Sequence, residues 1–345
     1  MTRLQTLLGI DLPILQAPMA GVQGSALAIA VSNAGGLGAL PCAMSTPEMI
    51  RSELEKIRAA TSRPVNVNFF CHMPPVVDAA REAAWRARLG PYYDEFGIDP
   101  ATIPAGPGRA PFSREAADVL EAFKPPIVSF HFGLPAPDLL ARVRAWGAKV
   151  LSSATTVDEA RWLEARGVDA IIAQGVEAGG HRGMFLSDDL TTQVGTFALL
   201  PQIVRAVKVP VIAAGGIADA EGVAAALAMG AGAAQLGTTF LLCPEATTSA
   251  THRAALKSDA VRHTALTNLF TGRPARGIVN RVIREVGPMH SATPAFPLAT
   301  AAIAPIRAKA EATGSGDFSP LWSGQNATGC REMPAGELVW RLAGR

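Results

Sequence analysis

The sequence predicts an α/β protein built on a closed (β/α)8 TIM barrel, with a small helical domain late in the chain. Short apolar runs alternate with alanine- and leucine-rich segments of helical period, a pattern typical of parallel strands joined by right-handed crossovers. Eight such units fit the barrel's usual length of about 250 residues. A doubly wound open sheet is the alternative, but no G-x-G-x-x-G turn follows the first strand candidate.

The elements follow from these runs in order. The strand candidates are residues 14–16, 37–40, 65–69, 127–130, 149–151, 170–173, 211–213 and 234–236. The helices expected between them cover residues 25–33, 47–60, 137–146, 157–166, 197–207 and 219–229. Several helices have a capping residue at their start, namely Thr46, Thr156 and Asp219, whose side chains accept hydrogen bonds from first-turn amides.

Two segments do not fit the bare barrel. An insertion at 71–126 has a proline- and glycine-rich middle, 90–111, which contains both tyrosines of the chain and predicts an irregular loop. The sequence leaves two roles for this loop, a lid over the site and a plain surface excursion. Residues 242–305 show no strand signal and predict a helical substrate or cap domain, which leaves 1–241 and 306–345 for the barrel.

Composition excludes several classes of function. The formal net charge is only +2 and no block of Lys or Arg occurs, so a nucleic-acid partner is not expected. No apolar run has the length of a membrane span, so no membrane partner is expected. The four cysteines are scattered without metal-ligand spacing, which predicts reduced thiols in a cytoplasmic protein and no metal site.

The chain is organised around residues 170–183, which read A-I-I-A-Q-G-V-E-A-G-G-H-R-G. A buried strand ends here in a glycine-rich loop, and glycines let main-chain amides approach a ligand closely. His181 in this loop is a group able to exchange a proton near neutral pH. Arg182 and Glu177 either support His181 or form a solvated ion pair.

Catalytic groups of such barrels gather where the strands end. The third strand places Asn66 and Asn68 on one face, the fourth presents His131, and the sixth gives Gln174. The seventh and eighth strands end in the loops that hold Gly215, Gly216, Gly237 and Thr238. Glycine-rich turns at these two positions form the usual phosphate site of the barrel, so a phosphate-bearing ligand is expected.

The amides of Asn68 and Gln174 suit a heterocycle with a carbonyl–imide edge, such as flavin or another cyclic imide. His131 and His181 are expected over its open face. The remaining histidines, His72, His252, His263 and His290, are interpreted as packing or surface groups.

At this point the chain resembles the nitronate monooxygenases, in particular the bacterial class I type. The resemblance rests on P-I-L-Q-A-P-M-A-G, N-V-N-F-F, S-F-H-F-G-L-P, A-Q-G-V-E-A-G-G-H-R-G, V-I-A-A-G-G-I-A-D, Q-L-G-T-T-F and G-S-G-D-F-S-P-L-W-S-G-Q. These motifs occur in order over nearly the whole chain. The family pattern departs at Phe296 and Ala299, where relatives often carry tyrosine and glutamine, which leaves the substrate open.

The resemblance implies a TIM barrel that binds FMN non-covalently and oxidises an alkyl nitronate or nitroalkane with O2. Propionate 3-nitronate is the implied substrate, and a carbonyl compound and nitrite are the implied products. It gives His181 the role of the active-site histidine and His131 that of a second one. The implied FMN contacts are Met19, Asn68, Gln174, Gly179, Gly180, Gly215, Gly216, Gln235, Leu236, Gly237 and Thr238. A homodimer is left open.

Two rival functions share these sequence features. An NAD(P)H-dependent flavin reductase of the quinone or enoyl-acyl-carrier-protein type has similar glycine-rich motifs on the same scaffold. A non-redox barrel that binds a phosphorylated ligand is a further alternative. His131 within S-F-H-F-G and the D-F-S-P-L-W segment favour the oxygenase.

Overall fold

The computed structural model describes residues 1–103 and 109–345. Its main feature is an eight-stranded parallel sheet in the order β1-β9-β8-β6-β5-β4-β3-β2. A parallel bridge between Leu15 and Leu37 joins the two edges, so the sheet closes into the predicted barrel. The strands are β1 (Ile14–Gln16), β2 (Gly38–Pro41), β3 (Val65–Phe70), β4 (Ile127–His131), β5 (Lys149–Ala154), β6 (Ala170–Gln174), β8 (Val211–Ala214) and β9 (Ala233–Leu236). All eight predicted strands are confirmed, with ends that differ by a few residues.

Helices surround the barrel, and their starts follow the predicted caps. Thr46, Thr156 and Asp219 each accept a hydrogen bond from an amide three residues on. The surrounding helices are α2 (Ser25–Asn33), α3 (Pro47–Ala60), α5 (Arg114–Phe123), α6 (Pro137–Ala145), α7 (Val157–Ala165), α8 (Thr196–Ala206), α9 (Ala220–Ala228) and α13 (Ala335–Leu342). The first helix, α1 (Arg3–Leu8), packs Leu4 and Leu8 into the cluster of barrel-interior side chains.

The alternation of side chains along β3 explains how the barrel presents polar groups. Val65, Val67 and Phe69 belong to the hydrophobic layer shared with the helices. Asn66 and Asn68 lie on the opposite face, as the two-residue period of a strand predicts. Asn68 donates from Nδ2 to Ser129 Oγ at 2.9 Å, which fixes its amide at the rim of the barrel.

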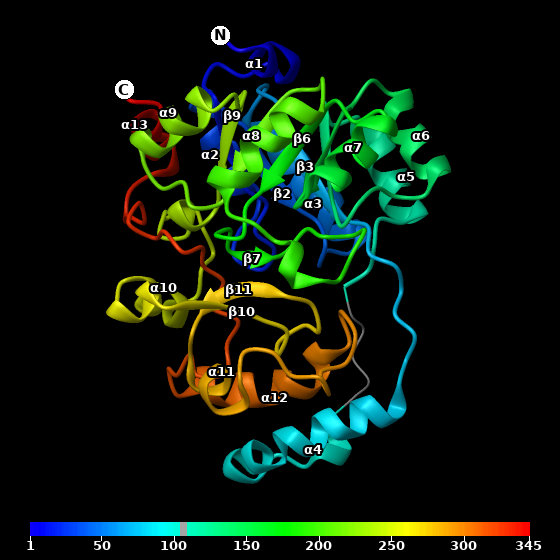
Figure 1. Ribbon diagram of the computed structural model, residues 1–345, viewed down its shortest axis with the longest axis vertical. Helices are drawn as coiled ribbons and strands as arrows, with labels where there is room; N and C mark the ends of the chain where they lie inside the picture. The colour runs from blue at the N-terminus through cyan, green and yellow to red at the C-terminus, as the bar shows by residue number, and fades with distance from the viewer. Residues whose placement is uncertain (104–108) are drawn as a thin grey trace.

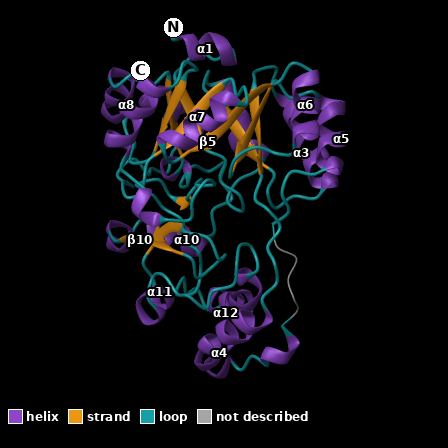
Figure 2. Cartoon of the chain, turned by 45° about the vertical axis from the view of Figure 1, so that its right-hand side comes forward, coloured by secondary structure: helices purple, strands orange, loops and turns teal. Residues whose placement is uncertain are grey.

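A second lobe lies below the carboxyl ends of the strands (Figure 1). Its three-stranded antiparallel sheet has the order β10-β11-β7, from β10 (Thr264–Thr267), β11 (Ala275–Ile278) and β7 (Gly180–His181). Its helices are α4 (Ala79–Phe96), α10 (Ala250–Leu256), α11 (Arg281–Val286) and α12 (Ala299–Ala312). Counted over both lobes, the described residues form four short 3-10 turns, η1 (Pro100–Thr102), η2 (Leu190–Thr192), η3 (Thr238–Phe240) and η4 (Asp259–Arg262). Figure 2 shows the two lobes with the termini on the barrel side.

This lobe corrects three expectations. Residues 242–305 are not wholly helical, because β10 and β11 pair there. The expected boundary between 305 and 306 falls inside α12, and this helix packs on α4 rather than returning to the barrel. Residues 90–96 of the expected loop are helical, since α4 continues through Pro91 and ends at Phe96.

The tyrosines of the insertion are anchors of this second lobe. Tyr92 donates to Glu285 Oε2 and Tyr93 to the carbonyl oxygen of Ala302, both at 2.8 Å. Both rings pack in a core with Trp85 and Phe318. The 104–108 part of the expected loop, and with it that part of the lid question, lies outside the described residues. No helix in the described residues is both long and apolar enough for a membrane span.

Candidate active site

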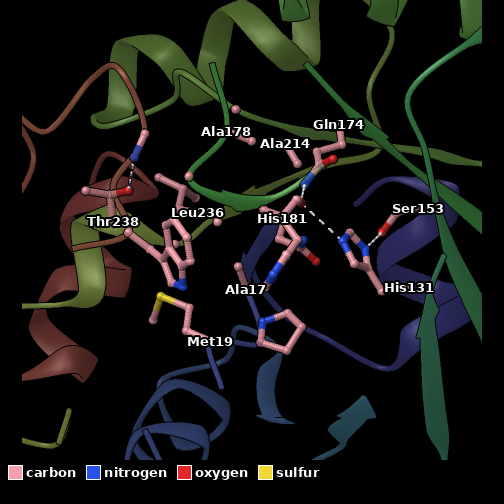
Figure 3. A pocket seen from close by; sticks show the side chains of 18 of the residues that line it. Ala17, Met19, His131, Ser153, Gln174, Ala178, His181, Ala214, Leu236 and Thr238 are labelled. Carbon is pink, nitrogen blue, oxygen red and sulfur yellow. Dashed lines mark hydrogen bonds between the residues drawn. The ribbon is translucent and has the colours of Figure 1, made fainter. Parts of the chain in front are cut away.

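A pocket lies where the barrel strands end and the second lobe begins. All of the predicted site residues line it: Met19, Asn68, His131, Gln174, Gly179, Gly180, His181, Gly215, Gly216, Gln235, Leu236, Gly237 and Thr238. Figure 3 shows His131 and Ser153 on one side of His181, with Met19 and Thr238 on the other. The closed barrel brings these residues together, because the carboxyl ends of all its strands share one rim.

The loops after β8 and β9 provide a cradle of main-chain amides. Gly215 and Gly216 have φ values of 113° and 74°, a left-handed backbone that glycine adopts without strain. No hydrogen bond among the described residues uses the amide N–H of Gly215, Gly216 or Gly237. Such unpaired amides, grouped in one pocket, suit a phosphate group and therefore fit the phosphorylated flavin that the sequence predicts.

A third segment completes this cradle; part of it falls within the motifs of the family resemblance, but the sequence does not place it in the site. Gly324 donates its amide to Thr238 Oγ1 at 2.9 Å. Asn326 donates from Nδ2 to the carbonyl oxygen of Gly216 at 3.0 Å. Both residues line the pocket. They follow a turn at Pro320 without strand or helix signal, so only the tertiary fold reveals their place.

His131 has both ring nitrogens engaged by the protein. Its Nε2 lies 3.2 Å from the carbonyl oxygen of His181, which can only accept, so Nε2 carries the proton. Nδ1 therefore accepts from the hydroxyl of Ser153 at 2.9 Å. Burial lowers the pKa of His131 to about 3, which keeps the ring neutral.

Gln174 holds the same turn from the other side. Its Nε2 donates to the carbonyl oxygen of His181 at 3.0 Å, and its Oε1 accepts from the amide of Gly183 at 2.7 Å. The carbonyl of His181 thus receives two side-chain hydrogen bonds. These bonds fix the backbone at the point where β7 leaves the barrel and pairs with β11.

Of the two histidines predicted for the site, His181 has the ring that is less engaged by the protein. Its Nε2 lies 3.0 Å from the hydroxyl oxygen of Thr271, and no hydrogen bond in the described part of the chain uses Nδ1. The ring lies 5.3 Å from that of Phe296 and 5.6 Å from that of Trp322, centroid to centroid. Burial, followed by the charge of Arg109, lowers the pKa of His181 well below its ordinary value.

Arg182 and Glu177 serve the loop and do not contact the ring of His181. Arg182 is fully buried and donates to the carbonyl oxygens of Gly175 and Gln174, both at 2.7 Å. Glu177 accepts from the amide of Thr196 at 2.8 Å. The sequence left open whether these two side chains support His181 or form a solvated ion pair. They do neither, and instead stabilise the β6–β7 turn.

Several pocket residues were missed by the sequence prediction. Arg109, Trp322 and His252 all line the pocket. His252, expected as an ordinary packing group, is buried and lies with Nε2 3.1 Å from the carbonyl oxygen of Trp322. Phe296, one of the two positions where the family pattern departs, lies against His181. The described residues contain no group of three or more potential metal ligands.

Comparison with known proteins supports one family. The family model described as nitronate monooxygenase matches residues 1–344. A nitronate monooxygenase from Paraburkholderia phytofirmans is 46% identical over 97% of this chain and 92% of its own length. One from Pseudomonas aeruginosa is 43% identical over 99% of this chain and 97% of its own.

Solved structures agree with this result. A nitroalkane oxidase from Streptomyces ansochromogenes has a TM-score of 0.89 at 41% identity, covering 99% of this chain and 96% of that one. FabK from Thermotoga maritima has a TM-score of 0.71 at 27% identity, covering 100% and 95% of the two chains. Because proteins with different names share this fold, the fold alone does not decide the function.

Proposed function

The chain belongs to the nitronate monooxygenase family, and on that premise we propose that it is an FMN-dependent enzyme that oxidises small alkyl nitronates with O2. The proposed products are a carbonyl compound and nitrite, with propionate 3-nitronate as the model substrate. The observation that carries the proposal is the imidazole of His181, whose Nδ1 has no partner among the described residues, in a pocket rimmed by main-chain amides that are likewise unpaired there.

The chain's own residues fit FMN. The amides of Gly215, Gly216 and Gly237 would hold the phosphate, and Asn68, Gln174 and Met19 would lie along the ring system. When bound, FMN supplies the electron-transfer chemistry that no side chain in the pocket can perform. The protein contributes binding, orientation and the electrostatic environment.

His181 is suited to bind an anion that is already formed. With its pKa held well below the ordinary value, the ring is a weak base toward the α-carbon of a neutral nitroalkane. It is a good hydrogen-bond donor to the oxygens of a nitronate, and an anion beside it would in turn favour the protonated ring. This electrostatic setting favours nitronates over neutral nitroalkanes as substrates.

His131 acts in this proposal through His181. Its two hydrogen bonds, to Ser153 and to the carbonyl oxygen of His181, leave neither nitrogen for a substrate. Together with Gln174 it fixes the backbone that carries the His181 ring. It is therefore a positioning residue.

Purified protein tests the proposal in three steps. A visible absorption spectrum should show bound flavin, and propionate 3-nitronate in air should give stoichiometric nitrite. Addition of NADH without oxygen should leave the flavin oxidised over the time of turnover. Rapid bleaching by NADH, with no nitrite from the nitronate, would support a pyridine-nucleotide-dependent reductase instead.

We further propose a cytoplasmic location, because Cys42, Cys71, Cys243 and Cys330 are all free thiols. A homodimer is part of the same proposal, and light scattering of the purified protein tests it.

A further inference from the structure

We propose that Arg109 forms a second anion subsite in the pocket wall, which selects nitronates that carry a carboxylate at the far end of a short carbon chain. This inference rests on the proposed function and names the residue that would recognise the carboxylate of its model substrate. The site would thus bind two negative groups, the nitronate near His181 and the carboxylate at Arg109.

The side chain of Arg109 has little to neutralise it. It lines the pocket, and its side chain makes one hydrogen bond within the described residues, from Nη1 to Thr300 Oγ1 at the long distance of 3.5 Å. None of the ion pairs in the described residues includes it. The neighbouring residues 104–108, which read P-A-G-P-G, contain no acidic side chain.

The other arginines near the site are already engaged by protein atoms. Arg182 donates to two carbonyl oxygens, and Arg276 donates to the carbonyl oxygen of Val176 and to Thr264 Oγ1. Arg273 donates to the carbonyl oxygen of Met184 and stacks on Phe132. None of these three lines the pocket, so Arg109 is the arginine that a bound ligand meets.

The backbone of Arg109 is fixed by a buried histidine. His72 Nε2 donates to the carbonyl oxygen of Arg109 at 2.9 Å. The His72 ring packs edge-on against Phe296, with 4.8 Å between the centroids. Although Arg109 follows a proline- and glycine-rich segment, this contact places it in a defined position.

Phe296 links Arg109 to the reacting end of the pocket. Its ring centroid lies 5.8 Å from the guanidinium carbon of Arg109 and 5.3 Å from the centroid of the His181 ring. Arg109 and His181 also line the same pocket, so a small ligand bound against His181 would face Arg109 as well. The field of Arg109 already acts on His181, where it is the largest charge effect on the pKa.

The chemistry of the pair favours a carboxylate. A guanidinium offers parallel N–H donors that match the two oxygens of a carboxylate. Burial lowers the pKa of Arg109 to about 10, so the group stays charged at neutral pH but has lost much of its hydration. A partly dehydrated, unneutralised cation gains most from an anionic ligand.

The test compares two nitronates of similar size. In the wild type, propionate 3-nitronate should have a lower KM than butyl nitronate. Arg109→Met should raise KM for propionate 3-nitronate roughly 10- to 100-fold, the range for hydrogen bonds to a charged group, and leave KM for butyl nitronate within about 2-fold. Arg109→Lys should restore part of the loss for the carboxylated substrate alone. Arg114→Met removes an exposed arginine paired with Asp138 and is the matched control.

A binding measurement separates this inference from the proposed function. Calorimetric titration of the flavin-loaded protein with 3-nitropropionate and with 1-nitrobutane should show preference for the former, which Arg109→Met abolishes. Equal losses for both ligands, or an unchanged preference, would overturn the subsite. If neither nitronate releases nitrite while the preference in binding persists, the proposed function fails and the subsite stands.

Discussion

His181 and His131 lie in the same pocket, but the protein uses them differently. His131 has both nitrogens bonded to protein atoms, whereas Nδ1 of His181 has no partner among the described residues. Sequence could place both at strand ends, but it could not tell them apart. The difference depends on Ser153 and on a carbonyl group that β7 turns toward His131.

Replacement of the less engaged histidine should separate binding from turnover. His181→Asn should retain FMN and lower kcat/KM for propionate 3-nitronate about 100-fold or more, because a positioned donor to the substrate anion is lost. Steady-state nitrite release together with flavin titration measures both quantities. His263→Asn, at an exposed position, is the control. Unchanged kcat/KM in His181→Asn would remove this residue from the mechanism.

Buried neutral histidines also make the stability depend on pH. The pKa of His131 is about 3 in the folded chain against an ordinary 6.5, so the unfolded chain binds more protons between these values. The contribution of His131 to the free energy of unfolding is therefore fully present above pH 6.5. It decreases as the pH drops and is smaller by about 2 kcal/mol at pH 5.

His131→Gln should remove that share of the pH dependence even if it also lowers stability at pH 7. Denaturant unfolding at pH 7 and pH 5 gives the difference for each protein. The exposed variant His263→Gln should keep the wild-type difference. An equal difference in all three proteins would show that His131 is not held neutral.

Among the elements, the β6–β7 turn does most to build the site, because it links the barrel to the second lobe. Its glycines are packed against the 323–326 segment: a Cβ at Gly179 would lie 2.6 Å from the amide nitrogen of Gly324. Backbone atoms cannot move away as a flexible side chain can. The sequence marks these glycines as a ligand loop, while the structure adds a packing requirement between distant segments.

Gly179→Ala should therefore separate the two segments. We expect a loss of about 1–3 kcal/mol in the free energy of unfolding, typical of overpacking, and weaker binding of FMN. Differential scanning calorimetry and flavin titration measure the two effects. Gly90→Ala, inside α4, is the control, because no atom outside its own helix neighbourhood lies within 4 Å of the new methyl group. Wild-type FMN affinity in Gly179→Ala would contradict this account of the loop.

At the scale of the whole molecule, the sequence predicted the barrel but not the sheet of the second lobe. Its strands are buried apolar runs such as Ala170–Gln174, whose residues alone predict a core strand. Strands β10 (T-A-L-T) and β11 (A-R-G-I) lack such a run, and they form because β7 provides an edge for pairing. Arg109 was missed for a similar reason: its segment predicts only a loop, and its place depends on His72 and Phe296.

The second lobe has a core of its own and should respond to its own mutations. Trp85 is fully buried there, between α4 and the rest of the lobe. Trp85→Ala should cost about 3–5 kcal/mol and lower turnover, whereas the barrel should still bind FMN. Phe197→Ala, at a ring of α8 that is 80% exposed, should cost less than 1 kcal/mol. Calorimetry with flavin titration checks both, and loss of FMN in Trp85→Ala would show that the lobes are not separable.

The most direct test of the central claim is a crystal structure of the protein with FMN bound. We expect the phosphate at the amides of Gly216 and Gly237 and the ring system beside His181. FMN bound elsewhere, or a His181 ring turned away from the flavin in crystals of active enzyme, would contradict this account.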